Sequence, residues 1–273
     1  MSTISKKALR IIGSALVVIL LTTDVTQAQV FPRLRARLQG IMGCEADSDF
    51  CGAADATFDA LPCCDYFGTQ RSLFNGTDLT GWTDVKGGAP GKGWVVEDGM
   101  IVHEENSGDL YVDGKFENFI LEFEFKISEK GNSGVKYRSW NTEGFGLGCE
   151  YQIFDDINVP DNPPRYQTAS LYDVIVPREN TAKLKMGEFN KGKIIVVGDH
   201  IEHYLNGELI VSVDVGSQEW NDAVAKSKFH DVPEFGTTKV GRVFLQDHGS
   251  KVWFKNLYIT ELQPTNAQSQ ICF

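Results

Sequence analysis

Apolar and polar residues alternate with a two-residue period along much of the chain, which is the period of a half-buried β-strand. In residues 119–127, Phe-Ile-Leu-Glu-Phe-Glu-Phe-Lys-Ile, the aromatic side chains face one way and Glu124 faces the other. Asp98-Gly99 and Asn206-Gly207 separate shorter runs of this kind and are typical hairpin turns. Strands at such short intervals predict an all-β fold, built as a two-sheet sandwich or jelly roll.

The same rule places a set of polar side chains on one side of the predicted sheet. In residues 135–138, 149–153 and 243–248 the apolar side chains suit a core, so the polar ones face outward. If these strands are neighbours, one face collects Glu124, Lys126, Lys136, Arg138, Glu150, Gln152, Gln246 and His248. A solvated sheet face is also polar. This set, however, mixes carboxylates, carboxamides, an arginine and a histidine, which favours a polar pocket.

Other polar residues leave alternatives open. Asn132 could point into such a pocket, although turn formation also explains it. His203 shares its side of a strand with aliphatic residues, which favours a hydrogen-bonded histidine in the core. Asp155-Asp156 and Asp161 could hold a hard cation, so a divalent metal stays open, although an acidic loop without metal is commoner.

Composition and missing motifs exclude several functions. The chain has 26 Lys and Arg against 37 Asp and Glu, a net charge of −11, which argues against binding nucleic acid. It contains no phosphate loop, dinucleotide fingerprint, Gly-x-Ser-x-Gly elbow or HExxH sequence. No redox cofactor, phosphoryl transfer or serine hydrolase chemistry is therefore predicted.

The chain divides into four parts. Residues 1–28 have the basic start, apolar stretch and small-residue end of a signal peptide, which predicts export to the periplasm or outside the cell, with no membrane span in the mature chain. Its removal moves the net charge to −13, because it takes away three basic residues and one acidic residue. Residues 29–70 hold four of the six cysteines, which predicts disulfide bonds. Residues 71–263 form the β domain, and 264–273 a tail.

A short helix is also predicted within the β domain. Residues 217–228 place Trp220 and Val224 one helical turn apart, so that both can face the sandwich. No internal repeat is visible, and nothing in the sequence indicates the oligomeric state.

Six motifs in order carry a resemblance to a known family. They are Leu73-Phe-Asn-Gly-Thr-Asp-Leu-Thr-Gly-Trp82, Gly131-Asn-Ser-Gly134, Glu150-Tyr-Gln-Ile153, Glu202-His-Tyr-Leu-Asn-Gly207, Leu245-Gln-Asp-His-Gly249 and Val252-Trp-Phe-Lys-Asn-Leu-Tyr-Ile259. This pattern, over about residues 72–262, resembles the 3-keto-disaccharide hydrolase family. The resemblance implies a concanavalin A-like jelly roll and a carbohydrate substrate, a 3-keto-glycoside. One loop departs from the family, because Thr168-Ala-Ser-Leu-Tyr-Asp173 replaces a Gly-rich stretch.

The implied chemistry is base-assisted elimination at C2 of the keto sugar, followed by hydration. We predict that His248 and Glu150 act as base and acid, in either order, and that Arg138 stabilises the enolate. The predicted substrate-binding residues are Asn132, Gln152, Gln246, Glu124, Lys136 and Tyr172.

Two alternatives remain. One is direct hydrolysis by a carboxylate pair such as Glu124 and Glu150, which needs a spacing of about 5–5.5 Å for retention or roughly 6.5–9.5 Å for inversion. The other is a non-catalytic carbohydrate-binding or cell-envelope module on the same fold. Trp82, Trp140 or Tyr172 forming an aromatic platform at the pocket would favour that module, whereas converging catalytic residues would favour an enzyme.

Overall fold

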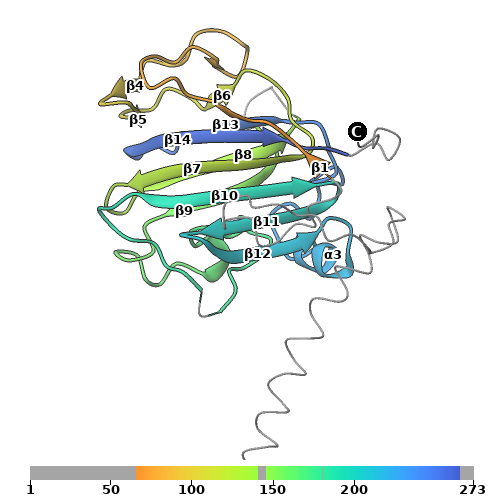
Figure 1. The fold of residues 1–273 in the computed structure, drawn as a ribbon. Helices are drawn as coiled ribbons and strands as arrows, with labels where there is room; N and C mark the ends of the chain where they lie inside the picture. The colour runs from red at the N-terminus through yellow and green to blue at the C-terminus, as the bar shows by residue number, and fades with distance from the viewer. Residues whose placement is uncertain (1–65, 141–145, 180, 265–273) are drawn as a thin grey trace, which may run out of the picture. The chain divides into compact units, whose positions relative to one another are not determined.

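The computed structural model describes residues 66–140, 146–179 and 181–264, which all belong to one compact unit beginning at Tyr66. Two antiparallel sheets lie face to face in this unit (Figure 1). This is the concanavalin A-like sandwich that the sequence predicts. The signal segment, most of the extension and the tail lie outside the described residues, as do Cys44, Cys51, Cys63, Cys64 and Cys272.

The larger sheet has eight strands in the order β12-β11-β10-β7-β14-β5-β4, with β2 paired to β14. Their bounds are β2 Gln70–Ser72, β4 Trp94–Glu97, β5 Met100–His103, β7 Phe119–Ile127, β10 Asn190–Val197, β11 His200–Leu205, β12 Glu208–Asp214 and β14 Val252–Glu261. Two of its hairpins turn at the predicted dipeptides. Asp98 and Asn206 adopt positive φ values of 49° and 52° there, which Asp and Asn tolerate better than most residues.

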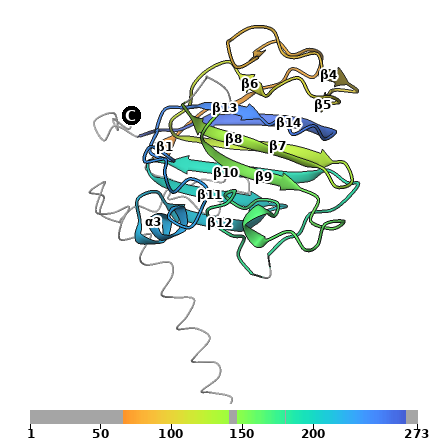
Figure 2. The same cartoon turned by 180° about the vertical axis from the view of Figure 1, so that it is seen from behind.

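The smaller sheet has five strands in the order β3-β6-β13-β8-β9 and carries the candidate site. Their bounds are β3 Trp82–Thr83, β6 Leu110–Val112, β8 Asn132–Ser139, β9 Cys149–Phe154 and β13 Arg242–Leu245. Seen from behind, β8, β9 and β13 lie in front of the larger sheet (Figure 2). A separate two-stranded pair joins β1 (Tyr66–Phe67) to β15 (Gln263–Pro264).

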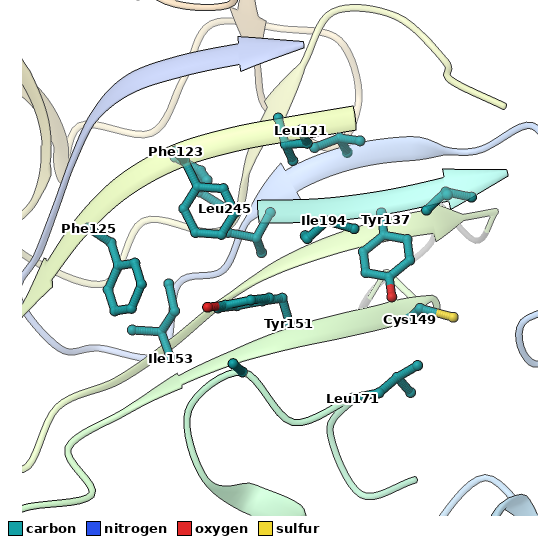
Figure 3. Close-up of a cluster of buried hydrophobic side chains, with 14 of the residues drawn as sticks. Leu121, Phe123, Phe125, Tyr137, Cys149, Tyr151, Ile153, Leu171, Ile194 and Leu245 are labelled. Atoms are coloured by element: carbon teal, nitrogen blue, oxygen red, sulfur yellow. The ribbon is translucent and has the colours of Figure 1, made fainter. Parts of the chain in front are cut away.

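The core fills the space between the two sheets. Phe123 and Phe125 of β7 meet the Tyr151 ring of β9 edge-on, at centroid distances of 5.3 and 6.4 Å (Figure 3). Burial of such aromatic side chains contributes about 1.5–3 kcal/mol each to folding. The period-two pattern therefore assigned the inward faces of both strands correctly.

Two smaller predictions also hold. Helix α3 spans Gln218–Val224, shorter than predicted, and the Ser217 hydroxyl accepts a hydrogen bond from Trp220 N as its N-cap. His203 is fully buried and hydrogen-bonds Tyr137 Oη at 2.7 Å and Ala169 O at 3.0 Å. It is the core histidine that the pattern favours.

One prediction about the polar face is wrong. Glu124 and Lys126 belong to β7, in the larger sheet, whereas the other predicted residues lie in the smaller sheet or, for Gln246 and His248, directly after its strand β13. Because β7 turns its phenylalanines inward, Glu124 lies on the outer face, where it pairs with Lys255 at 3.5 Å. Glu124 therefore cannot bind the same substrate as Glu150 or form a carboxylate pair with it.

Among the described residues, no helix is long and apolar enough to cross a membrane. Two segments of turns pack against the sandwich. They are residues 168–175 and residues 225–241, which follow α3. The core receives Leu171, Phe229 and Phe235 from these two segments.

Candidate functional site

A row of four side chains crosses the outer face of the smaller sheet. Strand register places Tyr111 of β6 opposite Phe244 of β13, Phe244 opposite Lys136 of β8, and Lys136 opposite Glu150 of β9. Directly paired residues share a face of an antiparallel sheet, so these four side chains point the same way. Their strand neighbours, such as Val135 and Tyr151, fill the core instead.

A cavity of about 770 Å³ opens above this row. Six of the nine predicted site residues line it: Asn132, Lys136, Glu150, Tyr172, Gln246 and His248. Sequence reasoning missed further lining residues, which include Asp84, Ser107, Asp109, Tyr111, Lys228, Phe229 and Asp247. Most of these lie on loops or on the short strand β6, where no alternation is long enough to assign a side.

Glu150 is the most buried carboxylate in the cavity wall. Its side chain is 6% exposed and lies 3.4 Å from Lys136 Nζ. Burial raises the pKa of Glu150, while the positive charges of Lys136 and Lys228, with His248, oppose that rise. A Cβ on Gly134 would come within 2.7 Å of Glu150 Oε1, so a glycine there leaves room for the carboxylate. A carboxylate whose pKa is raised in this way is a stronger base than a solvated glutamate.

Lys228 approaches the same carboxylate from the segment after α3. Its ammonium lies 4.2 Å from the Tyr172 ring centroid, and both residues line the cavity. Partial burial lowers the pKa of Lys228, and the charge of Glu150 opposes that shift. Glu150 therefore lies near two cations, Lys136 and Lys228.

Several buried polar atoms in the cavity wall have no hydrogen-bond partner in the described part of the protein. They are Ser107 Oγ, Tyr111 Oη, Asn132 Oδ1 and Gln246 Oε1. Leaving such atoms unpaired costs about 1–3 kcal/mol each. A ligand rich in hydroxyl groups would satisfy them, and a sugar is such a ligand.

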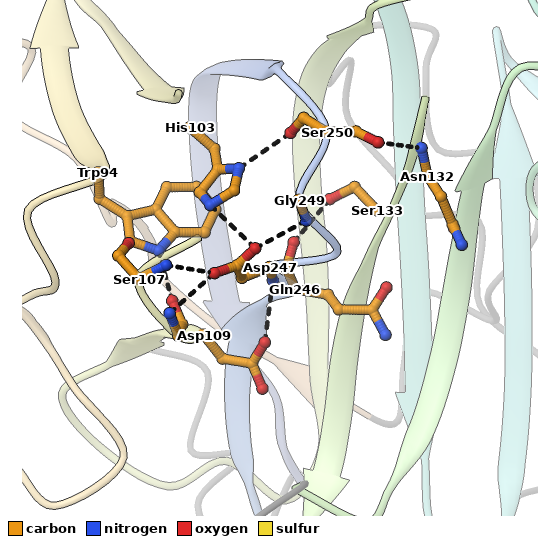
Figure 4. A network of polar contacts seen from close by, with 11 residues as sticks. Trp94, His103, Ser107, Asp109, Asn132, Ser133, Gln246, Asp247, Gly249 and Ser250 are labelled. Carbon is orange, nitrogen blue, oxygen red and sulfur yellow. Dashed lines mark hydrogen bonds and ion pairs between the residues drawn. The ribbon is translucent and has the colours of Figure 1, made fainter. Parts of the chain in front are cut away.

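The Asp247 carboxylate links the turn after β13 to the end of β5 and to the loop 106–108 beside the cavity (Figure 4). Asp247 lies 3.1 Å from His103 Nε2 and accepts hydrogen bonds from the backbone of Ser107, Gly108 and Gly249. Although burial opposes it, these backbone donors and the nearby histidine lower the pKa of Asp247. Asp247 thus fixes the chain on either side of His248 rather than offering a reactive carboxylate.

Asp109 and Tyr111 also belong to the wall of the cavity. Asp109 accepts a hydrogen bond from Asp247 N at 2.9 Å, and burial raises the pKa of its carboxyl group. Burial, together with the charge of Asp109, raises the pKa of Tyr111 to about 12, so the phenol keeps its proton at neutral pH.

The predicted place of Arg138 is wrong. Lys136 and Arg138 should share a face, but the β8–β13 register shifts between Arg242 and Phe244, and Arg138 has a positive φ of 52°. The bulge breaks the alternation. The Arg138 side chain is 1% exposed, does not line the cavity, and donates to Gly236 O at 3.2 Å and to Gly198 O. It ties neighbouring turns together instead of facing a substrate.

Gln152 is also absent from the cavity wall. It follows Glu150 on the same face but is 2% exposed, and the segment 169–170 pairs with its backbone. Ala169 N donates to Gln152 O at 2.8 Å, and Gln152 N donates to Ser170 O at 3.2 Å. The loop that departs from the family pattern thus pairs with β9 at this position.

The aromatic residues weighed for a binding platform are dispersed. Trp82 is buried, and its Nε1 donates to Leu73 O at 2.8 Å. Trp140 packs against the core and does not line the cavity, whereas Tyr172 does. One of these three residues therefore faces the cavity.

The acidic loop after β9 has a structural role. Asp155 accepts hydrogen bonds from the backbone of Lys130, Ile157 and Asn158. Throughout the residues that the structure describes, no three His, Cys, Asp or Glu side chains are grouped as metal ligands. Cys149 is a buried free thiol whose pKa burial raises to about 12, so it is protonated at neutral pH.

The sandwich carries a polar cavity on the outer face of its smaller sheet, and comparisons with known proteins show that this is a glycoside hydrolase-like domain. The family model for the 3-keto-alpha-glucoside-1,2-lyase-like domain matches residues 69–260. The chain is also 33% identical over 227 residues to the 3-keto-disaccharide hydrolase of Bacteroides thetaiotaomicron, covering 70% of this chain and 78% of that protein. The chain belongs to this family.

Solved structures agree with this assignment. A candidate glycosyl hydrolase from Parabacteroides distasonis matches with a TM-score of 0.66 and 35% identity, over 71% of this chain and 94% of that chain. A second candidate glycosyl hydrolase from the same organism has a TM-score of 0.56 and 24% identity, over 70% and 98% of the two chains. The second likeness concerns the fold alone.

Proposed function

We propose that this protein cleaves 3-keto-glycosides by elimination across C1 and C2, followed by addition of water. The observation that carries the proposal is the buried Glu150 beside Lys136, at the base of a cavity whose wall has four unpaired polar atoms. The name of the Bacteroides relative supports the same substrate class.

Glu150 is the base in this proposal. A ketone at C3 acidifies the C2 proton, and Glu150 removes that proton while the electron pair moves through C2–C3 onto the C3 oxygen. Lys136 is the cation closest to Glu150, so it replaces Arg138 as the group that stabilises the enolate. The pair is preorganised, because both side chains come from directly paired strand positions.

His248 is the acid. It is exposed at the cavity rim, where the departing part of the substrate can leave, whereas Glu150 is enclosed. As the enolate pair returns to form C1=C2, the C1–O bond breaks and His248 gives its proton to the leaving oxygen. Water then adds at C1, and C2 regains a proton. Asn132 and Gln246 hold sugar hydroxyls through their unpaired oxygens.

The test is turnover of a chromogenic 3-keto-glucoside beside the unoxidised glucoside, with and without a chelator. We expect cleavage of the keto compound alone, with exchange of its C2 proton for solvent deuterium. Cleavage of both compounds would instead indicate direct hydrolysis. If neither is cleaved although sugars bind to the folded protein, the carbohydrate-binding alternative replaces the enzyme.

A further inference from the structure

Tyr111 is a cavity residue that the proposed reaction has not used. Tyr111 lines the cavity, is 1% exposed, and its buried hydroxyl has no hydrogen-bond partner in the described part of the protein. It is absent from the hydrophobic core cluster, although Leu110 and Val112 on either side belong to it. A buried phenol with its oxygen unpaired toward a cavity is costly unless something binds there.

Tyr111 and Lys136 flank one aromatic ring. The Tyr111 ring stacks on Phe244 at a centroid distance of 4.3 Å, and Lys136 Nζ lies 5.7 Å from the same Phe244 ring. The three residues are register neighbours, so Tyr111 and Lys136 begin two strand spacings, roughly 10 Å, apart. Tyr111 and Lys136 both line the cavity, whereas Phe244 between them is fully buried, so the two side chains can reach one ligand atom from either side of this ring.

The backbone of Gly146, a cavity residue, packs closely against Phe244 and the Tyr111 hydroxyl. An added Cβ on Gly146 would approach the Phe244 ring to 2.7 Å and Tyr111 Oη to 2.8 Å. Any side chain at this position would therefore clash with the phenol oxygen and the ring, so the packing around Tyr111 requires a glycine here.

Arg242 fixes the Tyr111 ring and strengthens its hydroxyl as a donor. The guanidinium lies 4.1 Å from the ring centroid and is held by Val85 O at 2.8 Å and Thr83 Oγ1 at 3.0 Å. A cation against the ring face withdraws electron density from the phenol, which favours donation of a hydrogen bond over acceptance. The hydroxyl is thus a rigid, protonated donor.

We propose that Tyr111 is a catalytic residue that donates a hydrogen bond to the C3 oxygen of the keto sugar as this oxygen becomes an enolate. This inference rests on the proposed function. Tyr111 and Lys136 would bind the oxygen from two sides, while Glu150, next in the row, takes the neighbouring C2 proton. The row would then recognise the ketone itself, because an uncharged hydroxyl at C3 gains no negative charge during the reaction.

The test compares Tyr111→Phe with the wild-type protein on the keto-glucoside. Removal of one such donor lowers kcat by about 10²-fold or more, because the bond strengthens in the transition state. We expect that loss in kcat, with KM within about 3-fold of wild type. Tyr258→Phe is the matched control, since Tyr258 is 37% exposed on β14 and should leave both constants unchanged.

A second readout separates donation from packing. Replacing Tyr111 by ring-fluorinated tyrosines changes the acidity of the phenol with little change in shape, so kcat should follow phenol acidity. Unchanged kcat in Tyr111→Phe, or a loss confined to KM, would overturn the inference while leaving the proposed function intact. Absence of turnover by the wild-type protein would overturn the proposed function, and the role of Tyr111 with it.

Discussion

At the residue scale, two opposing electrostatic effects set the pKa of Glu150. Burial raises the pKa of its carboxyl group, and Lys136 at 3.4 Å limits the rise and keeps the charged form accessible. A fully solvated glutamate would be a weaker base, and a buried one without a cation would stay protonated. The balance suits proton abstraction from a carbon next to a ketone.

Replacing Glu150 by glutamine should therefore abolish most of the activity. Glutamine keeps the size of the side chain but cannot take a proton, so we expect kcat for the keto-glucoside to fall by about 10²–10⁴-fold. In the wild-type protein, activity should rise with pH through a pKa above the usual value of 4.5, because the base must be ionised. Initial rates across pH measure both effects.

Glu261→Gln is the control for Glu150→Gln. Glu261 is half exposed and pairs with Arg71 on the surface, away from the cavity, so its loss should leave the rate and its pH profile unchanged. Full activity in Glu150→Gln would remove Glu150 from the mechanism.

At the element scale, the turn after β13 depends on one carboxylate. Asp247 accepts three backbone hydrogen bonds and pairs with His103, which itself packs against Trp94 at a centroid distance of 4.5 Å. These contacts hold the residues that carry Gln246 and His248 against the loop 106–108 (Figure 4).

Truncation of this carboxylate should loosen the rim of the cavity. Asp247→Ala would remove the partner of the buried His103 and of three backbone donors, so we expect a loss of about 1–3 kcal/mol in the free energy of unfolding. Activity should also fall, because His248 would lose its fixed position. Urea unfolding and turnover measure the two effects, and Asp231→Ala, at an exposed site, serves as control. Unchanged stability would show that the pair does not hold the loops.

His203 connects the two sheets and makes stability depend on pH. Burial lowers its pKa to about 4, so between about pH 4 and the unfolded value of 6.5 the unfolded chain binds a proton that the folded one does not. The stability that neutral His203 contributes is therefore fully present above pH 6.5 and is lost as pH falls toward 4. The loss amounts to about 3 kcal/mol, at 1.36 kcal/mol per pKa unit.

His203→Gln should flatten this part of the profile, measured by urea unfolding between pH 4 and 7; an identical slope would exclude His203 as its source.

The period-two pattern predicted much of the fold but only part of the candidate site. Lys136 and Glu150 were placed correctly because their strands are regular and directly paired. The prediction put Arg138 on the wrong face because a bulge interrupts the pairing of β8 with β13. Such a bulge depends on the partner strand, so the local sequence does not reveal it. Glu124 was misplaced because sheet order is a property of long-range pairing. Tyr111 was missed because the three residues of β6 are too few to reveal a side.

At the scale of the whole molecule, the sandwich leaves the outer face of its smaller sheet for the site. The larger sheet and the core supply rigidity, and the segments after β9 and α3 rise around the cavity. An outer face of this kind can be hydrophilic without cost to the core, since each strand alternates its sides. The row from Tyr111 to Glu150 can therefore contribute polar groups to the cavity wall while the other side of each strand packs into the core.

An enzyme of this kind needs access to glycosides, and we propose that the protein is exported. The basic start, apolar stretch and small residues at the end of 1–28 carry this proposal. Expressed as a full chain, it should accumulate outside the cytoplasm with Gln29 as its first residue. Replacing Ala28 by a bulky residue should block processing, because signal cleavage requires small side chains. Intact-mass measurement of the cell fractions tests both; a cytoplasmic protein that retains residues 1–28 would contradict export and place the substrate inside the cell.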